Sequence, residues 1–380
     1  MLDMPRAKDD ADVFFMRQAL ELAKKGEGRV APNPPVGCVL VKSGVVAGKG
    51  WHDRLGALHA EAMALRDAGS LARGATVYVT LSPCASHGRQ PPCADALIAA
   101  QVARVIAAVD DPNPQNASGL EKLRQAGIPA VSGLLRAEAE YLARGFFKKQ
   151  LRHLPYLTLK YAMTLDGKIA SIAGDSRWIS GEESRELVHD LRSRSDAILI
   201  GSGTALADNP RLTVRDPVWS SRGGSKRHIQ PRRVIVDSRG RTPPGAALFN
   251  SNPPGGETSV AVTDQADPAR LAALAAAGAR ILRFSSPDGR VPLYQLIKQL
   301  GEDGANHILC EGGGELAAGL LAAGLIDEIW AFITPKLIGG REAPGPVGGA
   351  GIALMGDAAA FVIRECRPMG GDWLIRAAPA

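Results

Sequence analysis

A His-Ala-Glu triplet at 59–61 is followed by two Pro-Cys pairs that end at Cys84 and Cys93. An imidazole and two thiolates are ligands that zinc prefers, and three protein ligands leave the fourth tetrahedral position for water. Zinc brings the pKa of a bound water close to neutrality, and a carboxylate that is not a ligand can then transfer protons. We therefore expect His59, Cys84 and Cys93 to converge on one zinc ion, with Glu61 beside it as the catalytic proton carrier.

The alternative interpretations of these residues are structural. A His-x-Glu triplet alone carries little information, and two cysteines at this spacing also occur as structural zinc ligands or core thiols. A structural zinc site would more often present four ligands, whereas three are evident in this sequence. Zinc nucleobase deaminases combine His-x-Glu with Pro-Cys-x-x-Cys, although here eight residues, 85–92, separate the two cysteines. A catalytic zinc site is therefore the favoured interpretation.

Composition sets the broad class of protein. The 380 residues suggest two domains, and the net charge of +6 fits an anionic substrate, a nucleic acid or an ordinary protein surface. Five cysteines, an odd number, suggest no disulfide framework, so we expect a reducing cytoplasm and buried thiols at Cys38, Cys310 and Cys366. Residues 1–12 do not read as a secretory signal, and no apolar run approaches the roughly 20 residues that span a bilayer.

The first half of the chain alternates short apolar strands with helices, which predicts a three-layer α/β sandwich around a largely parallel sheet. A basic helix at 137–151 precedes Pro155, so we place the boundary between a domain 1–153 and a domain 154–380. The predicted helices are 13–25, 59–69, 94–100 and 120–126, and the predicted strands are 36–41, 45–49, 75–81, 102–109 and 128–131.

The second half predicts a mixed sheet with glycine-rich turns. Ser180 with Glu183 forms a capping box that starts a helix, and Asp166-Gly167 predicts a tight turn. The segments 201–204 and 311–315 each follow a strand, where a phosphate can approach free backbone N–H groups. An ordinary strand–turn–helix is an equally good interpretation of 311–315 alone. The predicted strands are 156–161, 197–200, 234–236, 308–310, 328–333 and 373–376, and a further helix is 316–323.

The run from Pro32-Asn33-Pro34-Pro35-Val36-Gly37 through the zinc residues to the Gly-Arg-Gln-Pro-Pro-Cys run at 88–93 resembles the deaminase half of the bifunctional riboflavin-biosynthesis (RibD) family. The resemblance implies a cytidine-deaminase-like fold and a diaminopyrimidinone substrate that carries a ribosylamino 5′-phosphate. It implies that Asn33 contacts the pyrimidine, His52 lies near the phosphate, and Arg89 helps to recognise the ring.

One departure from the family pattern affects the ring site. The family usually has Ser-His-x-Gly after the first cysteine, whereas this chain has Ala-Ser-His-Gly at 85–88. Either His87 reaches the ring from a shifted position, or Ser86 takes its place.

The second half resembles the reductase half of the same family, which implies a dihydrofolate-reductase-like fold and NADPH as cofactor. The matching runs are 160–168, 176–179, 197–215, 234–238 and 308–340. By this resemblance the NADPH contacts are Ala162, Trp178, Thr204, Asp208, Ser238, Gly313 and Gly314, and the sugar-phosphate contacts are Lys160, Ser176, Arg192, Leu212, Arg215 and Glu311.

The resemblance thus implies two consecutive reactions: zinc-dependent hydrolytic deamination of the pyrimidine, then NADPH reduction of its ribosyl group to a ribityl chain. Lys160 and Asp208 are the candidate proton donors of the second step. The expected partner is the phosphorylated pyrimidine, without nucleic acid or membrane, in a cytoplasmic homo-oligomer that is a dimer or a tetramer.

Two other functions are compatible with parts of this sequence. A deaminase of tRNA or single-stranded DNA is supported by the basic segment 220–233, but aromatic residues make up only 5% of the chain, which leaves few for base stacking. A zinc-stabilised ligand sensor would bind metal but release no ammonia from a pyrimidine.

Overall fold

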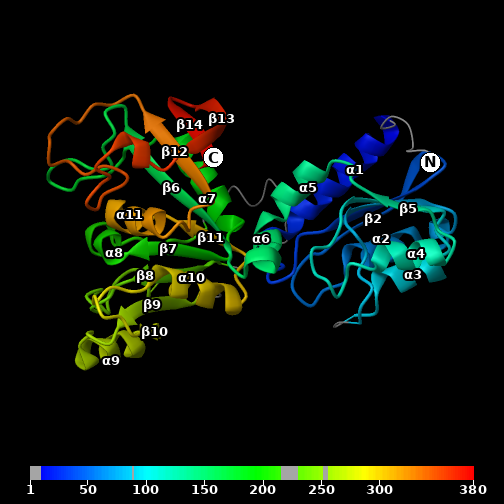
Figure 1. The fold of residues 1–380 in the computed structure, drawn as a ribbon, viewed down its shortest axis with the longest axis horizontal. Helices are drawn as coiled ribbons and strands as arrows, with labels where there is room; N and C mark the ends of the chain where they lie inside the picture. Colours follow the sequence, from blue (N-terminus) through cyan, green and yellow to red (C-terminus); the bar gives the residue numbers. More distant parts are fainter. Residues whose placement is uncertain (1–9, 88–89, 215–229, 251–255) are drawn as a thin grey trace. The chain divides into compact units, whose positions relative to one another are not determined.

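The computed structural model describes residues 10–87, 90–214, 230–250 and 256–380. The chain packs as two compact units, Met1–His153 and Leu154–Ala380, and each unit is built around its own sheet (Figure 1). Within the described residues, no helix combines the length and the apolar character needed to cross a membrane.

The sheet of the first unit has five strands in the order β2-β1-β3-β4-β5. The pairs β3–β4 and β4–β5 are parallel, whereas β1 is antiparallel to both of its neighbours. The antiparallel hairpin follows from Ser43 and Gly44, whose positive φ angles of 51° and 77° form a tight turn between β1 and β2. The strands are β1 (Gly37–Lys42), β2 (Val45–Trp51), β3 (Thr76–Leu81), β4 (Arg104–Val109) and β5 (Ala130–Ser132).

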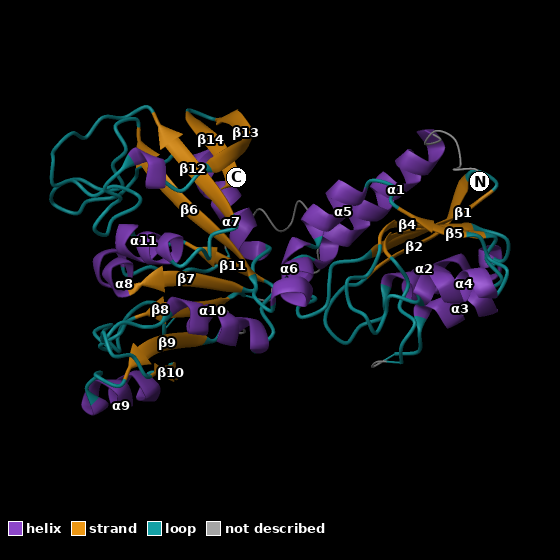
Figure 2. Cartoon of the chain, in the orientation of Figure 1, coloured by secondary structure: helices purple, strands orange, loops and turns teal. Residues whose placement is uncertain are grey.

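Helices cover both faces of this sheet, which confirms the three-layer sandwich (Figure 2). Helices α1, α5 and α6 pack on one face, and α2, α3 and α4 pack on the other. The stretch expected to be helical at 137–151 is helical, but it forms two helices, because the chain breaks at Ala143 between α5 and α6. The helices are α1 (Asp10–Ala23), η1 (Lys24–Gly26), α2 (Ala60–Ala68), η2 (Gly69–Ala72), α3 (Cys93–Ala99), α4 (Gly119–Gln125), α5 (Arg136–Leu142) and α6 (Arg144–Arg152).

The sheet of the second unit has nine strands in the order β10-β9-β8-β7-β11-β6-β12-β14-β13. The strands from β10 to β12 are parallel, and β14 and β13 complete the sheet antiparallel, which confirms the predicted mixed sheet. The strands are β6 (Tyr156–Thr164), β7 (Ala197–Gly201), β8 (Arg232–Val236), β9 (Thr258–Thr263), β10 (Arg280–Phe284), β11 (His307–Cys310), β12 (Glu328–Thr334), β13 (Phe361–Met369) and β14 (Asp372–Pro379).

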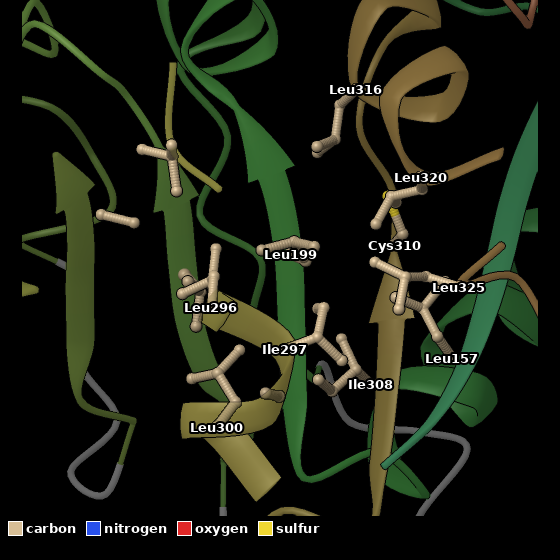
Figure 3. Close-up of a cluster of buried hydrophobic side chains, with 14 of the residues drawn as sticks. Leu157, Leu199, Leu296, Ile297, Leu300, Ile308, Cys310, Leu316, Leu320 and Leu325 are labelled. Atoms are coloured by element: carbon tan, nitrogen blue, oxygen red, sulfur yellow. The ribbon is translucent and has the colours of Figure 1, made fainter. Parts of the chain in front are cut away.

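The core of the second unit lies on both faces of this sheet. On one face, side chains of α10 and α11 such as Leu296 and Leu320 pack on Leu199 of β7 and Ile308 of β11 (Figure 3). Helices α7, α8 and α9 cover the other face. The helices are α7 (Glu182–Ser193), α8 (Ser202–Asp208), α9 (Pro268–Ala276), α10 (Leu293–Glu302), α11 (Gly314–Ala322) and η4 (Met355–Asp357).

The structure differs from two local expectations. The capping box at Ser180 is wrong, because α7 begins after Gly181, whose N–H donates to the buried carboxylate of Asp372 at 2.7 Å. Asp372 also accepts the Ser184 hydroxyl at 2.6 Å, so the C-terminal hairpin caps this helix from outside it. Cys366 is exposed on the edge strand β13 and is not a buried thiol.

Candidate active sites

Three elements of the first unit bring the predicted zinc ligands together. His59 is the N-cap of α2, Cys84 follows β3, and Cys93 is the first residue of α3. The Nδ1 atom of His59 lies 3.7 Å from the sulfur of Cys84 and 3.4 Å from that of Cys93. All three ligand atoms lie within 4.8 Å of one another, a spacing that one tetrahedral ion can bridge.

Local hydrogen bonds hold these ligands in place. The Gln90 side chain donates to the carbonyl of Ala57 at 2.6 Å and accepts the N–H of His59 at 3.3 Å, which fixes the start of α2. The N–H of Cys93 donates to the sulfur of Cys84 at 3.2 Å. The thiol of Cys93, followed in importance by His59, lowers the pKa of Cys84 to about 4, while sharing that proton raises the pKa of Cys93. One thiolate is therefore already favoured, and a divalent cation would favour the second.

Glu61 lies in the first turn of α2 and is buried, with 4% of its surface exposed. Burial, and then the charge of Cys84, raises the pKa of Glu61 to about 7. A carboxyl group with such a pKa can take up a proton and return it near neutral pH. The donor set of two sulfurs and one imidazole, with this carboxyl beside it, fits a catalytic zinc ion.

The structure brings Asn33 and His52 into direct contact. Their side-chain nitrogens, Nδ2 and Nε2, are 3.1 Å apart, and Nδ1 of His52 lies 3.0 Å from the carbonyl oxygen of Leu58. The ring of His52 also meets the ring of His59 edge-on, with 5.6 Å between centroids. Of the three residues proposed for this substrate, His52 therefore contacts a zinc ligand directly, and Asn33 reaches the site through His52.

The sequence analysis missed a polar network beside Cys84. Ser86 donates to Asn116 at 2.7 Å, and Asn116 donates to the buried carboxylate of Asp111 at 3.0 Å. The sequence could have indicated this network. Asp111 follows β4 and Cys84 follows β3, and the carboxyl ends of these two parallel strands lie at the same edge of the sheet. His87 is exposed, so Ser86 is the residue that faces inward at this position. Arg89 lies outside the described residues.

In the second unit, the chain order in the sheet reverses between β7 and β11. Ligands of open α/β sheets bind outside the carboxyl ends of the strands at such a point. Thr204 of α8 and Gly313, the N-cap of α11, meet here: among the described residues, a Cβ on Gly313 would have the Thr204 hydroxyl alone within 4 Å, at 3.5 Å. The predicted loop at 201–204 is instead the start of α8. Gly314 is packed closely, since a Cβ there would lie 2.9 Å from the carbonyl of Gly345.

The loop that follows β6 carries Ser176 and Trp178. Ser176 donates to the carboxylate of Asp208 at 3.2 Å, so a predicted substrate contact and a predicted cofactor contact touch. Trp178 is 65% exposed, and the guanidinium carbon of Arg185 lies 4.9 Å from the centroid of its ring. Lys336, which the sequence analysis missed, donates to the carbonyls of Trp178 at 2.6 Å and Ile179 at 3.0 Å. Ala162 lies on β6, half-buried.

Lys160, Arg192 and Glu311 form a largely buried ion cluster, with 17%, 15% and 8% of their side-chain surfaces exposed. Arg192 donates to both oxygens of Glu311, at 2.6 and 2.9 Å, and to the carbonyl of Thr213 at 3.3 Å. Lys160 lies 4.0 Å from Glu311. Burial alone would raise the pKa of Glu311, but Arg192 and then Lys160 outweigh it and hold that pKa below its usual value. The fork of Arg192 is thus turned to Glu311, not to an open phosphate position.

The remaining predicted contacts are spread along the same edge. Ser238 follows β8, and its hydroxyl accepts the N–H of Val291 at 3.1 Å. The Leu212 side chain is buried in the core, so a ligand contact there would use its backbone. Arg215 lies outside the described residues.

Comparison with protein families matches each unit separately. Residues 9–109 match the cytidine and deoxycytidylate deaminase zinc-binding region. Residues 155–375 match the RibD C-terminal domain. The zinc ligands lie within the first match, and the cluster around Glu311 lies within the second.

Individual relatives match nearly the whole chain. The riboflavin biosynthesis protein RibD of Escherichia coli is 44% identical over 369 residues, which covers 95% of this chain and 97% of the relative. The solved structure of Acinetobacter baumannii RibD is 37% identical, with a TM-score of 0.85 over 98% of this chain and 99% of that one. A deaminase/reductase structure from Thermotoga maritima is 33% identical, with a TM-score of 0.84 over 98% and 99%.

Proposed function

Since the chain belongs to the RibD family of bifunctional riboflavin-biosynthesis enzymes, we propose that its two units catalyse consecutive steps on one phosphorylated pyrimidine. In this proposal the first unit deaminates 2,5-diamino-6-ribosylamino-4(3H)-pyrimidinone 5′-phosphate. The second unit then reduces the ribosyl group to give 5-amino-6-ribitylaminouracil 5′-phosphate. The deaminase/reductase structure from Thermotoga maritima, which matches over both units, supports this substrate.

His59, Cys84 and Cys93 would hold the zinc ion, and their convergence within 4.8 Å is the observation that carries the proposal. When bound, zinc supplies a Lewis acid that makes water nucleophilic at neutral pH. Glu61 would take up a proton from the attacking water and deliver it to the departing ammonia. Its burial keeps the carboxyl group able to exchange a proton near neutrality.

Asn33, His52 and Arg89 would bind the substrate of this step. The His52 imidazole is held by the Leu58 carbonyl, and the Asn33 amide lies against it. Together they place polar groups at the side of the zinc site, where a ring and its phosphate chain must be oriented.

In the second unit, NADPH supplies the hydride, while the protein aligns the two reactants. Lys160 is the favoured proton donor over Asp208, because burial lowers the pKa of Lys160 and so eases release of its proton. Residues proposed to bind NADPH are Ala162, Trp178, Thr204, Asp208, Ser238, Gly313 and Gly314. Residues proposed to bind the sugar phosphate are Lys160, Ser176, Arg192, Leu212, Arg215 and Glu311, where Arg192 acts by holding Glu311.

The test is Glu61→Gln in the full chain, with the diaminopyrimidinone nucleotide and NADPH supplied together. Ammonia release should fall by at least about 100-fold, while NADPH oxidation on the separately supplied deaminated substrate persists. Glu138→Gln, at an exposed position of α5, is the matched control and should leave both activities intact. Undiminished ammonia release from Glu61→Gln would refute the role of Glu61.

We also propose a cytoplasmic homo-oligomer, a dimer or a tetramer, that acts without nucleic acid. Bacterial relatives that share both units support a biosynthetic enzyme of this kind. The basic segment that favoured a nucleic-acid partner, 220–233, lies mostly outside the described residues, and Arg232 and Arg233 at its end belong to β8. Tight, salt-sensitive binding of RNA would argue against the proposal.

A further inference from the structure

The proposed cofactor contacts have an order along the carboxyl edge of the nine-stranded sheet. Lys336, after β12, holds the loop of Trp178; Gly313 follows β11; and Thr204 and Ser238 follow β7 and β8. If Trp178 flanks the nicotinamide and the turn at Gly313 holds the pyrophosphate, the adenosine must extend over the end of β8. The phosphate that distinguishes NADPH from NADH is on that adenosine ribose.

Arg241 lies at this end of β8 and is held from two sides. Its Nη2 donates to the hydroxyl of Ser202, at the start of α8, at 2.8 Å, and its Nε lies 3.9 Å from the carboxylate of Asp237. The side chain nevertheless remains 53% exposed. Ser202 and Asp237 directly follow Gly201 and Val236, which are register partners on the parallel strands β7 and β8. Arg241 therefore bridges two neighbouring strand ends.

Asp237 organises the turn that brings Arg241 to this position. Its carbonyl accepts the N–H of Gly240 at 2.9 Å, and Gly240 has a φ of 63°, which reverses the chain. Its Oδ2 accepts both the N–H and the hydroxyl of Thr242, each at 2.7 Å. Among the described residues its Oδ1 is buried without a hydrogen-bond partner, and the Nε of Arg241 lies 3.9 Å from it. A fully buried carboxylate in this state needs a nearby cation, so it fixes the orientation of Arg241.

We propose that Arg241 binds the 2′-phosphate of NADPH and thereby selects NADPH over NADH, with Asp237 as its positioning residue. This inference rests on the proposed reductase function of the second unit. Nε and Nη2 of Arg241 face Asp237 and Ser202, so a phosphate would meet the remaining N–H donors of the exposed guanidinium. Anchoring by Ser202 and Asp237 lowers the entropy lost on binding. Arg239 and Arg290 are exposed near Ser238 and add positive charge around the same position.

The experiment measures dissociation constants of the full chain for NADPH and NADH by fluorescence titration, and for adenosine 2′,5′-bisphosphate and 5′-AMP by calorimetry. Arg241→Ala should raise the dissociation constants for NADPH and the bisphosphate by about 10- to 100-fold, since a hydrogen-bonded charge pair is lost. Binding of NADH and 5′-AMP should change less than about twofold. Arg241→Lys should fall between wild type and Arg241→Ala, because it keeps the charge but loses the fork.

Two further variants separate this role from a general effect on folding. Arg283→Ala removes an exposed arginine on β10, two strands away from β8, and should leave all four constants unchanged. Asp237→Asn should weaken the binding of NADPH more than the binding of NADH. The affinity of this variant for NADH reports whether the site is intact. Equal losses for NADPH and NADH in Arg241→Ala, or no loss of either, would overturn the inference. A wild-type chain that binds neither nucleotide would instead overturn the proposed reductase function and this inference with it.

Discussion

The Nε2 atom of His52 accepts a hydrogen bond from the side-chain amide of Asn33 across 3.1 Å. The direction follows from the other side of the ring, because the Leu58 carbonyl can only accept and so requires a hydrogen on Nδ1. Burial lowers the pKa of His52, which favours the neutral ring that this arrangement needs. The pair therefore presents a fixed tautomer beside the zinc ligands.

Asn33→Ala should lower deamination by at least about tenfold, because it removes a proposed substrate contact and leaves Nε2 of His52 without this donor. The loss of stability should be about 1–3 kcal/mol, the usual cost of a buried polar group that loses its partner. Ammonia release and urea unfolding of the full chain measure the two effects. NADPH oxidation on deaminated substrate is the internal control, and an unaltered rate of deamination would contradict the proposed contact.

Cys84→Ser and Cys93→Ser should each reduce zinc content from about one ion per chain to a small fraction, because a three-ligand site loses a thiolate. Metal analysis by mass spectrometry measures this, and ammonia release should fall in parallel. Cys366→Ser is the matched control, since that thiol is exposed on β13 in the other unit. Full zinc retention by both ligand variants would show that these sulfurs do not bind the ion.

Glu311→Gln should destabilise the second unit by about 3–5 kcal/mol at neutral pH, because it leaves Arg192 buried without its carboxylate. The folded-state pKa of Glu311 lies below its ordinary value, so the ion pair contributes stability above that value. This stability is lost as the pH falls through the folded-state pKa. The difference between wild type and variant should therefore narrow below about pH 4, as urea unfolding at several pH values would reveal. A difference that widens on acidification would contradict the assignment.

Lys336→Met should lower the rate of NADPH-dependent reduction by about tenfold, because the loop of Trp178 loses two charge-assisted hydrogen bonds. Steady-state kinetics should place much of the effect in the KM for NADPH, while ammonia release stays unchanged. Lys298→Met, on the exposed face of α10, removes a lysine whose contact is Glu302 at 3.9 Å and should have no effect. Equal losses in the two variants would mean that Lys336 does not position this loop.

The zinc site could be predicted from the sequence because each of its ligands lies beside a pattern formed by neighbouring residues. His59 precedes an apolar helix, and each cysteine follows a proline at an element end, so spacing alone indicated where they meet. The positions of β1 through β5 followed from the same periodicity. The sheet was expected to be largely parallel, and it is parallel from β3 to β5, whereas β1 is antiparallel to both β2 and β3. The two-residue turn at Ser43 and Gly44 joins antiparallel strands.

The reductase site was less predictable because its contacts join distant parts of the chain. Arg192 was expected at a phosphate, but its fork meets Glu311, 119 positions away. Similarly, Asp372 caps α7 from 191 positions away, so no local pattern could replace the capping box expected at Ser180. The elements β9, α9, β10 and α10 were not predicted, although their alanine- and leucine-rich runs are periodic.

The position of β6 in its sheet affects when the second unit can fold during synthesis. It is the first strand of the second unit, yet its neighbours in the sheet are β11 and β12, which are near the end of the chain. The first unit can close its sheet soon after residue 132 has been translated, because its five strands are nearby in sequence. β6 is apolar, and it stays without its partner strands until most of the remaining chain has been synthesised. Nascent chains stalled within the second unit should therefore depend on chaperones, whereas chains stalled just beyond the first should not.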